Sequence, residues 1–328
     1  MSHRALAMLS VLVVPMLFVS TTIAQQGERS AGESRSAPLT PWGHPDLQGV
    51  WTNTTTTPLE RPADLAGQAV LTEEEWALRN PLSTLSDDRP AGGVGFYNDF
   101  WLDQGQLSMR TSLLVDPPDG QLPPVTEAER LAQDGRSDSY IGDTFDSWED
   151  FNAYDRCITR GMPGTMMPGF YNHNYQILQT PDYVAIVVEM IHDARIIPLD
   201  GRPHLAPTVR QWLGDSRGRW EGDTLVVETT NSTDKVKARA YPRRDIHTVF
   251  GGDDQLHLVE RFTRVDADTI AYEFTVTDPS VWTAPWTAAA PMTKLDGQLF
   301  EYACHEGNYS VPNILAGARA EDRAAQGR

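Results

Sequence analysis

Residues 255–278, QLHLVERFTRVDADTIAYEFTVTD, decide the fold of this chain. Apolar and polar side chains alternate along both halves of the stretch, which is the period-two pattern of a half-buried β-strand. Asp266-Ala267-Asp268 separates the two halves with residues that favour a tight turn. The stretch therefore predicts an antiparallel hairpin with one apolar face. That face carries Leu256, Leu258, Ile270, Tyr272, Phe274 and Val276.

Stretches of similar character lie on both sides of this hairpin. They are apolar, contain many β-branched residues and are separated by short turns: 171–180 (YNHNYQILQT), 183–191 (YVAIVVEMI), 194–201 (ARIIPLDG), 219–230 (RWEGDTLVVETT) and 298–306 (QLFEYACHE). At least seven strands with no helix between them are typical of an antiparallel barrel or sandwich. We therefore expect a mainly β fold, in which residues 171–310 form an antiparallel β-barrel or a curved sandwich.

The preceding part of the chain, residues 41–170, is predicted to be irregular, with short helices packed on the barrel. PWGHPDLQGVW (41–51) has neither helical nor strand periodicity, so we interpret it as an irregular segment on the surface. Thr72 and Thr126, each followed three residues later by a glutamate, predict the capping boxes of two short helices. RTSLLVDPPDGQLPP (110–124) predicts a short strand and a turn. A C-terminal helix and tail are expected over 311–328.

The N-terminus has the features of a secretory signal peptide. Residues 1–24 combine a basic start, an apolar stretch and small residues before Gln25. A membrane anchor is the alternative, but Pro15 interrupts an apolar run of about 15 residues, whereas a span needs roughly 20. Residues 25–40 are polar and predict a flexible linker. We therefore expect a periplasmic or secreted protein without stable membrane insertion after cleavage.

The cysteine content fits an oxidising compartment. The chain has two cysteines, Cys157 and Cys304, and an exported protein with an even, minimal count usually oxidises the pair. The pattern favours a disulfide, with two free core thiols or a catalytic cysteine as the alternatives.

The charge balance excludes one class of partner. The chain has 27 basic and 45 acidic side chains, a formal charge of −18, and no basic run. Such a surface repels phosphate backbones, so we expect no binding to nucleic acid.

The densest group of ionisable residues lies in EMIHDARIIPLDGRPH (189–204). Burying unpaired charges between apolar strands is costly, so the group indicates mutual pairing or a wet cavity. If the chain turns at Asp193, Glu189 and Arg195 face each other across a hairpin, and His192 lies beside a carboxylate that raises its pKa. His192 then serves as general acid or base, Glu189 orients it, and Arg195 stabilises an anion. A structural ion pair with an exposed histidine is the alternative.

Further candidate residues come from the strands. On a strand, Asn172, Asn174 and Gln176 share one face, either lining a cavity for a polyol or sugar or facing solvent. Tyr175 and Tyr302 are candidates for a second acid. His173, His204 and His305 are candidate ligand contacts. Their spacing matches no metal motif, so we expect neither a metal nor another cofactor.

Two motifs resemble known sites but have the wrong context. Gly214–Gly218 matches G-x-S-x-G around Ser216, yet a strand pair follows it, whereas a nucleophile elbow requires a helix there. Residues 138–155 are acidic and aromatic, but their spacing matches no EF-hand calcium loop. We interpret the first as part of a hairpin and the second as a solvated or interface-lining loop.

Several segments together resemble a family of secreted β-rich proteins of environmental bacteria. They are GRWEGDTLVVETTN (218–231), EMIHDARIIPLDGRPH (189–204), WGHPDLQGVW (42–51), RTSLLVDPPDG (110–120) and YEFTVTDP (272–279). The resemblance covers nearly all of the chain after the linker. It implies a lipocalin-like β-barrel and carries over no catalytic residue.

Two kinds of function fit these features. The first is an exported barrel enzyme, a lyase, hydratase, isomerase or hydrolase, acting by acid/base chemistry on a polar small molecule or a carbohydrate. The alternative is a non-catalytic barrel that binds a small ligand, or an interaction module of the cell envelope. A half-buried His192 that opens to a cavity favours the enzyme.

Overall fold

The computed structural model describes seven segments of the chain: residues 37–79, 105–134, 145–169, 171–236, 239–240, 249–250 and 252–327. The chain divides into two compact units, Met1–Arg35 and Ser36–Arg328, and the described residues all belong to the second. The predicted signal peptide and most of the predicted linker lie outside the described residues. Within these segments, no helix has the length and apolar character needed to cross a membrane.

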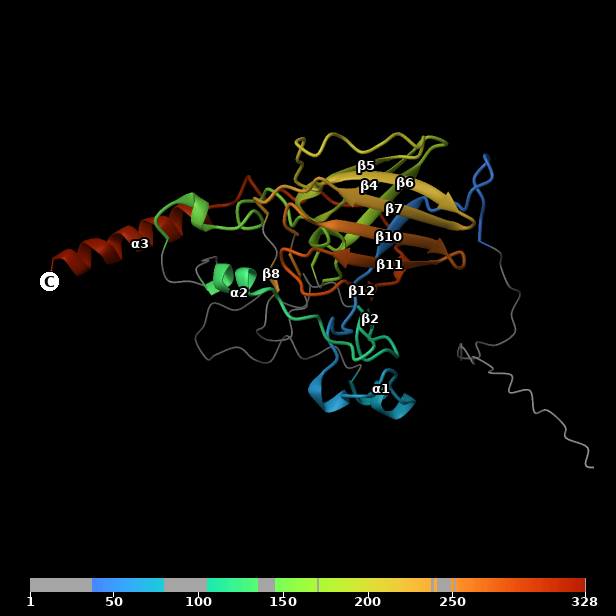
Figure 1. Cartoon of the computed structure of the whole chain (residues 1–328), viewed down its shortest axis with the longest axis horizontal. Coiled ribbons are helices and arrows are strands. Elements are labelled where there is room, and N and C mark those ends of the chain that lie inside the picture. The colour runs from blue at the N-terminus through green and yellow to red at the C-terminus, as the bar shows by residue number, and fades with distance from the viewer. Residues whose placement is uncertain are drawn as a thin grey trace, which may run out of the picture. The chain divides into compact units, whose positions relative to one another are not determined.

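An eleven-stranded antiparallel sheet forms the centre of the fold (Figure 1). Its principal strand order is β5-β4-β3-β1-β13-β11-β10-β7-β6, and β12 pairs with both β11 and β2. The terminal strands β5 and β6 lie side by side, so the sheet curves into a nearly closed barrel. The strands are β1 (Gly49–Thr52), β2 (Leu114–Asp116), β3 (Asn174–Gln179), β4 (Tyr183–Val188), β5 (Ala194–Pro198), β6 (Asp215–Glu221), β7 (Thr224–Thr230), β10 (His257–Arg264), β11 (Thr269–Thr277), β12 (Trp286–Ala289) and β13 (Met292–Lys294). The short strands β8 (Arg239–Ala240) and β9 (Val249–Phe250) pair separately.

The hairpin predicted from residues 255–278 is confirmed. Strands β10 and β11 pair in continuous register from His257 opposite Thr277 to Arg264 opposite Ile270. Buried and partly exposed residues alternate along both strands, as expected when one face of a sheet packs on the core. The mainly β, barrel-like fold class is therefore confirmed.

The interpretation of residues 41–51 as an irregular surface segment was wrong for its last three residues, whereas residues 41–48 are irregular as expected. Gly49–Thr52 forms strand β1, which lies between β3 and β13 inside the sheet, and Trp51 is fully buried. The Trp51 indole N–H donates to the Leu47 carbonyl at 3.0 Å. Four residues are too few to show a reliable period of two, so the strand is visible only through its partners.

The predicted last strand was also misplaced. Residues 298–306 contain no strand, and Phe300 is 70% exposed. The chain instead completes the sheet with β12 and β13, on either side of Pro291. Proline cannot donate to a ladder, so it obscures two short strands in the sequence.

The predicted helices are present. At α1 (Glu73–Arg79), the Thr72 hydroxyl accepts from the Glu75 N–H at 3.2 Å, and the Glu75 carboxylate accepts from the Thr72 N–H at 2.8 Å. Helix α2 (Glu127–Asp134) begins after Thr126, and α3 (Ser310–Gln326) forms the C-terminal helix. The 3₁₀ helices are η1 (Ala63–Leu65), η4 (Trp148–Asp150), η5 (Gly164–Met166) and η6 (Met190–His192).

The segment that leads into β1 packs over one end of the barrel. The Gln179 side chain accepts from the Leu47 N–H at 3.0 Å and donates to the Pro45 carbonyl at 3.2 Å. His44 stacks on Trp220 with 4.8 Å between ring centroids. The Arg264 guanidinium lies 4.6 Å from the Trp51 ring and donates to backbone carbonyls, including that of Asp46.

The segment around η5 packs on the other end. The Asn53 amide donates to the Met166 carbonyl at 2.8 Å, and the Tyr175 hydroxyl donates to the Thr165 carbonyl at 3.3 Å. Met162 and Met166 are at most 1% exposed. Both ends of the barrel are therefore covered by segments from the half of the chain that precedes β3.

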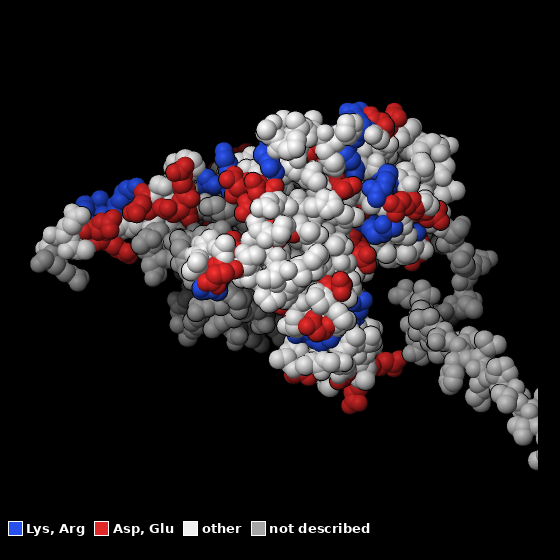
Figure 2. Space-filling model, in the orientation of Figure 1, with Lys and Arg blue, Asp and Glu red and all other residues white. Residues whose placement is uncertain are grey.

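Charged side chains of both signs lie together on the outside of β6, β7 and β10 (Figure 2). Arg219 pairs with Glu221 at 2.9 Å and approaches Glu228 at 3.6 Å, while Arg261 reaches Glu221 at 3.2 Å. These pairs are solvent-exposed, and exposed ion pairs contribute little to stability. They are therefore suitable exposed controls for substitutions in a buried ion pair.

The position of β1 predicts a large difference between two aromatic truncations. Trp51→Ala should lower the free energy of unfolding by about 3–5 kcal/mol, because it empties a site in the core. Phe300→Ala should change it by less than about 0.5 kcal/mol, because that ring is exposed. Urea denaturation of both variants measures the difference. Equal losses would contradict the placement of β1.

Candidate functional site

A buried ion pair crosses the interior of the barrel. Arg195 of β5 and Glu260 of β10 form a two-pronged contact: Nη1 donates to Oε1 at 2.9 Å, and Nη2 donates to Oε2. The two side chains are 1% and 0% exposed. Each points inward because it occupies a position that alternates with outward-facing neighbours on its strand.

Three hydroxyl groups surround this pair. The Tyr272 hydroxyl of β11 donates to Glu260 Oε1 at 2.9 Å. Ser216 of β6 and Thr229 of β7 are hydrogen-bonded to each other at 2.8 Å, and both lie near Arg195 Nη2, at 3.4 and 3.5 Å. We call these five residues the interior polar cluster. It joins five strands across a core that is otherwise largely apolar.

One donor of the cluster has no acceptor. Within the described part of the chain, the buried Nε of Arg195 has no hydrogen-bond partner. The buried indole nitrogen of Trp220, also on β6, has none there either. A buried donor without an acceptor costs about 1–3 kcal/mol. Such a group requires an explanation, for example a bound water or ligand.

The cluster favours a charged pair among neutral tyrosines. Burial acts to lower the pKa of Arg195, but the charge and hydrogen bonds of Glu260 outweigh it and raise that pKa. Burial raises the pKa of Tyr272 well above its ordinary value, and the charge of Glu260 adds to the effect. Burial likewise raises the pKa of Tyr175. Arg195 therefore stays cationic, and both phenols stay protonated.

The predicted pairing of Arg195 with Glu189 was wrong. Glu189 is 3% exposed and accepts from the Asn174 amide at 2.6 Å and from the Phe300 N–H at 3.0 Å. Arg195 instead faces the interior and pairs with Glu260. The chain makes a short 3₁₀ helix, η6, between the two strands rather than a tight hairpin, so the two residues point to different places.

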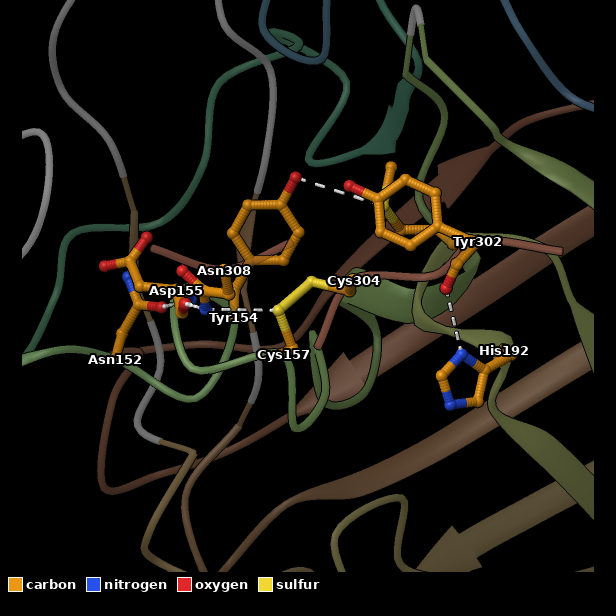
Figure 3. The surroundings of a disulfide bond; sticks show 9 residues. Asn152, Tyr154, Asp155, Cys157, His192, Tyr302, Cys304 and Asn308 are labelled. Carbon is orange, nitrogen blue, oxygen red and sulfur yellow. Dashed lines mark hydrogen bonds between the residues drawn. A yellow bond between two sulfur atoms is a disulfide. The ribbon is translucent and has the colours of Figure 1, made fainter. Parts of the chain in front are cut away.

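The expectation that His192 is at most partly exposed was also wrong, although the neighbouring Asp193 carboxylate interacts with it electrostatically. The side chain is exposed, and its Nδ1 lies 3.1 Å from the Tyr302 carbonyl, to which it donates (Figure 3). Its backbone has a φ of 51°, after Ile191 at 62°, so the ring leaves the direction of strand β4. This contact between the predicted catalytic residues His192 and Tyr302 uses the backbone of Tyr302 and not its hydroxyl.

The predicted disulfide between Cys157 and Cys304 is confirmed (Figure 3). Its Cα atoms are 5.7 Å apart, and the bond joins residues 147 positions apart in sequence. The Asn308 amide donates to Cys157 Sγ at 3.4 Å and to the Asp155 carbonyl at 2.9 Å. The bond thus holds the segment before α3 against the segment that leads into η5.

His173 was predicted as a ligand contact, but the structure gives it a packing role. Its Nδ1 lies 2.8 Å from the Met167 carbonyl and its Nε2 lies 2.8 Å from Arg160 Nη1. A carbonyl only accepts and a guanidinium only donates, so the ring is the neutral Nδ1–H tautomer. A Cβ at Gly169 would lie 2.0 Å from the ring, so only glycine allows this approach.

The polar ladder expected in 171–176 lies outside the interior. Asn174 and Gln176 are half-buried on the face of β3 opposite to Tyr175, while Asn172 lies before the strand with a φ of 54°. Tyr175 is fully buried inside the barrel. The alternation is therefore as predicted, and the amides occupy the outer face.

The remaining candidates are separate from the interior polar cluster. His204 contacts Asp215 through its Nδ1 at 2.9 Å, and His305 is exposed. Ser216 lies within strand β6, as the hairpin interpretation of its motif expected. Of the acidic loop, residues 138–144 lie outside the described residues.

Sequence reasoning missed most of the interior polar cluster. It identified Arg195 but not Glu260, Tyr272 or Thr229, and it considered Ser216 only as a nucleophile. A signal was present: Glu260 interrupts the apolar face between Leu258 and Phe262. An acid on the inward face of a clean hairpin indicates a buried partner.

No protein-family model, curated protein or solved structure matches the chain. In the described segments, no group of three or more His, Cys, Asp or Glu side chains is placed to hold a metal ion. The geometry of the interior polar cluster is therefore the basis for a function.

The ion pair predicts an unequal effect of single and double substitution. Arg195→Met should destabilise the protein by about 3–5 kcal/mol, because it leaves the Glu260 charge buried and unpaired. The double variant Arg195→Met/Glu260→Met should recover most of this loss, since it removes both charges. Chemical denaturation measures both values. A double variant that is less stable than the single one would contradict this account.

His173 predicts a loss of stability in weak acid. Burial and the charge of Arg160 hold the pKa of His173 well below 6.5 in the folded protein. Just below pH 6.5, His173 is therefore protonated in the unfolded chain but still neutral in the folded protein. Its contribution is complete above about pH 6.5 and is lost below it, by up to about 1.4 kcal/mol per pH unit.

Denaturation between pH 8 and pH 5 tests this. His173→Gln should cost stability at pH 8, and its deficit relative to the native protein should shrink below pH 6.5. His305→Gln, at an exposed site, serves as the control. A deficit that is constant with pH would show that His173 does not titrate in this way.

Proposed function

We propose that the protein is an exported, non-catalytic β-barrel that binds a small polar molecule at the interior polar cluster. The observation that carries this proposal is the buried Nε of Arg195, which has no acceptor among the described residues. A ligand oxygen at this position would satisfy the donor. Ser216 and Thr229, beside Arg195 Nη2, would add hydroxyl contacts.

Stability alone does not account for the cluster. Replacing a buried ion pair by apolar side chains of similar volume is often neutral or stabilising. The walls around the cluster are apolar, so such residues would suit this interior. An ion pair with three hydroxyl groups is better explained by recognition, because polar groups in an apolar site fix the orientation of a ligand.

We propose that a ligand reaches the cluster through the seam between β5 and β6. Backbone ladders join the other neighbouring strands of the principal order, whereas none joins β5 to β6 in the described residues. Side chains from β5 and the residue after it pack against the backbone of β6: a Cβ added at Gly218 would lie 2.6 Å from Leu199 Cδ2 and 2.9 Å from Ile197 Cγ2. Separating the two strands breaks no ladder hydrogen bond, and Arg195 and Ser216 lie on the two sides of this seam.

The binding function takes precedence over the enzyme for a specific reason. Acid/base catalysis was expected from a half-buried His192 oriented by Glu189. In the structure His192 is exposed and contacts a backbone carbonyl, and Glu189 is engaged elsewhere. Within the interior polar cluster, the Tyr272 hydroxyl already donates its hydrogen bond to Glu260. The arrangement supports holding a ligand more than it supports moving a proton.

Export is part of the proposal. The features of residues 1–24 support it, and the Cys157–Cys304 disulfide is compatible with an oxidising compartment. The covering segments at both ends of the barrel are anchored by hydrogen bonds, which suits a binding protein with an enclosed site.

A thermal-shift screen of the mature protein tests the proposal. The probes are monosaccharides, polyols, and small amides and ketones. A compound that binds only the folded state raises stability by about 2.7 kcal/mol at a hundred times its Kd. We expect compounds that stabilise the native protein and not Arg195→Met/Glu260→Met.

The matched control removes an Arg–Glu pair from the outer surface. Arg219→Met/Glu221→Met should keep the ligand-induced shift, because both side chains lie on the outer face of the barrel. If Arg195→Met/Glu260→Met kept the ligand-induced thermal shift, the ligand would bind at another site. A complete absence of shifts in the native protein would overturn the proposed function.

A further inference from the structure

We infer that the interior polar cluster selects an uncharged hydrogen-bond acceptor, such as a hydroxyl, ether or carbonyl compound, and rejects an anion of the same size. The inference rests on the proposed function and adds the chemical class of the ligand. It starts from the charge balance around the buried Arg195, whose Nε has no acceptor among the described residues.

The positive charge of Arg195 is already matched. Both terminal nitrogens of its guanidinium donate to the two oxygens of Glu260. Paired in this way, the two residues carry no net charge. Tyr272 is neutral, and its hydroxyl donates a hydrogen bond to the same carboxylate. An incoming ligand therefore finds an open N–H, but no unmatched cation.

The remaining hydrogen-bonding capacity of the cluster is mainly that of a donor. Arg195 Nε offers one N–H. Ser216 and Thr229 have two hydroxyl protons, and one of them is used in the bond between the two side chains. One O–H therefore stays available beside the guanidinium. Two neighbouring donors suit a ligand oxygen with two lone pairs.

Three other buried arginines, Arg61, Arg160 and Arg264, have partners of their own. Arg61 donates to the Thr111 hydroxyl at 2.9 Å and to the Pro118 carbonyl at 3.2 Å. Arg264 is directed at the backbone carbonyls of Asp46, Asp266 and Ala267 at one end of the barrel. Arg160 is held against His173 and the Tyr154 ring, with the segment that leads into η5. These hydrogen bonds go to groups outside the interior polar cluster.

An anion at Arg195 Nε would meet opposing fields. It would be attracted by the guanidinium and repelled by Glu260, whose oxygens accept from the same group. An ion that leaves water loses its hydration energy, and attraction to buried partners must offset this loss. An arginine that is already paired with a carboxylate provides little net attraction. A neutral oxygen has a smaller desolvation cost and gains the same hydrogen bonds. The site therefore discriminates by charge rather than by size.

Matched pairs of probes test the inference by calorimetry and thermal shift. The pairs are acetamide with acetate, benzamide with benzoate, and glucose with glucuronate. In the native protein, we expect the neutral member of a pair to bind at least tenfold more tightly than the anion. The affinity of the neutral member should not change with sodium chloride concentration, because its binding matches no charge.

Glu260→Gln provides the converse measurement. The amide keeps the shape of the carboxylate but leaves the Arg195 charge unmatched, so the preference should reverse and the anion should bind at least tenfold more tightly than it does to the native protein. If this variant does not fold, the comparison within the native protein decides alone.

The outcomes separate the two proposals. An anion that binds the native protein as tightly as its neutral partner, or more tightly, would overturn the inference and leave the proposed function intact. An anion preference that does not appear in folded Glu260→Gln would also overturn it. If no member of any pair binds the native protein and the wider screen has no hit, the proposed function itself fails.

Discussion

The contact between Arg195 and Glu260 does in the interior what backbone hydrogen bonds do elsewhere in the barrel. Strand β5 ends one side of the sheet, and β10 lies near the other end of the strand order. The ion pair spans the barrel between them and lies beside Ser216 of β6. At the seam between β5 and β6, side chains rather than backbone hydrogen bonds thus hold the barrel closed. Because these side chains are polar, the feature that closes the barrel is also the place where we propose that a ligand binds.

The general architecture could be predicted because it follows from local patterns. The alternation in residues 255–278 reflects a strand that packs one face on a core, and the capping boxes at Thr72 and Thr126 act within a few residues. The Cys157–Cys304 pair could be inferred from compartment and count. Strand β1 could not, because its four residues are ordered by partners far along the chain, Tyr175 and Lys294. The residues close to β1 in the sequence do not indicate which distant strands pair with it.

The candidate site illustrates the same limit for side chains. Four ionisable residues within 189–195 looked like one cluster, yet the structure gives them separate surroundings. Glu189 accepts a hydrogen bond from the Asn174 amide, His192 faces solvent, and Arg195 enters the barrel. A single 3₁₀ turn with two residues at positive φ is enough to separate them. The partner of Arg195 lies on a strand 65 positions away, where only the break in an apolar face indicated it.

The place of β1 has a consequence for the order in which the molecule is assembled. A ribosome or a translocation channel delivers the chain from its N-terminus, so Gly49–Thr52 appears first. Both strands that flank it, β3 and β13, come later, and β13 lies just before the C-terminal helix. Non-local pairings of this kind slow folding, since a long loop must close before they form. Strand β1 therefore lacks one of its two neighbouring strands, and Trp51 stays exposed, until almost the whole chain has been delivered.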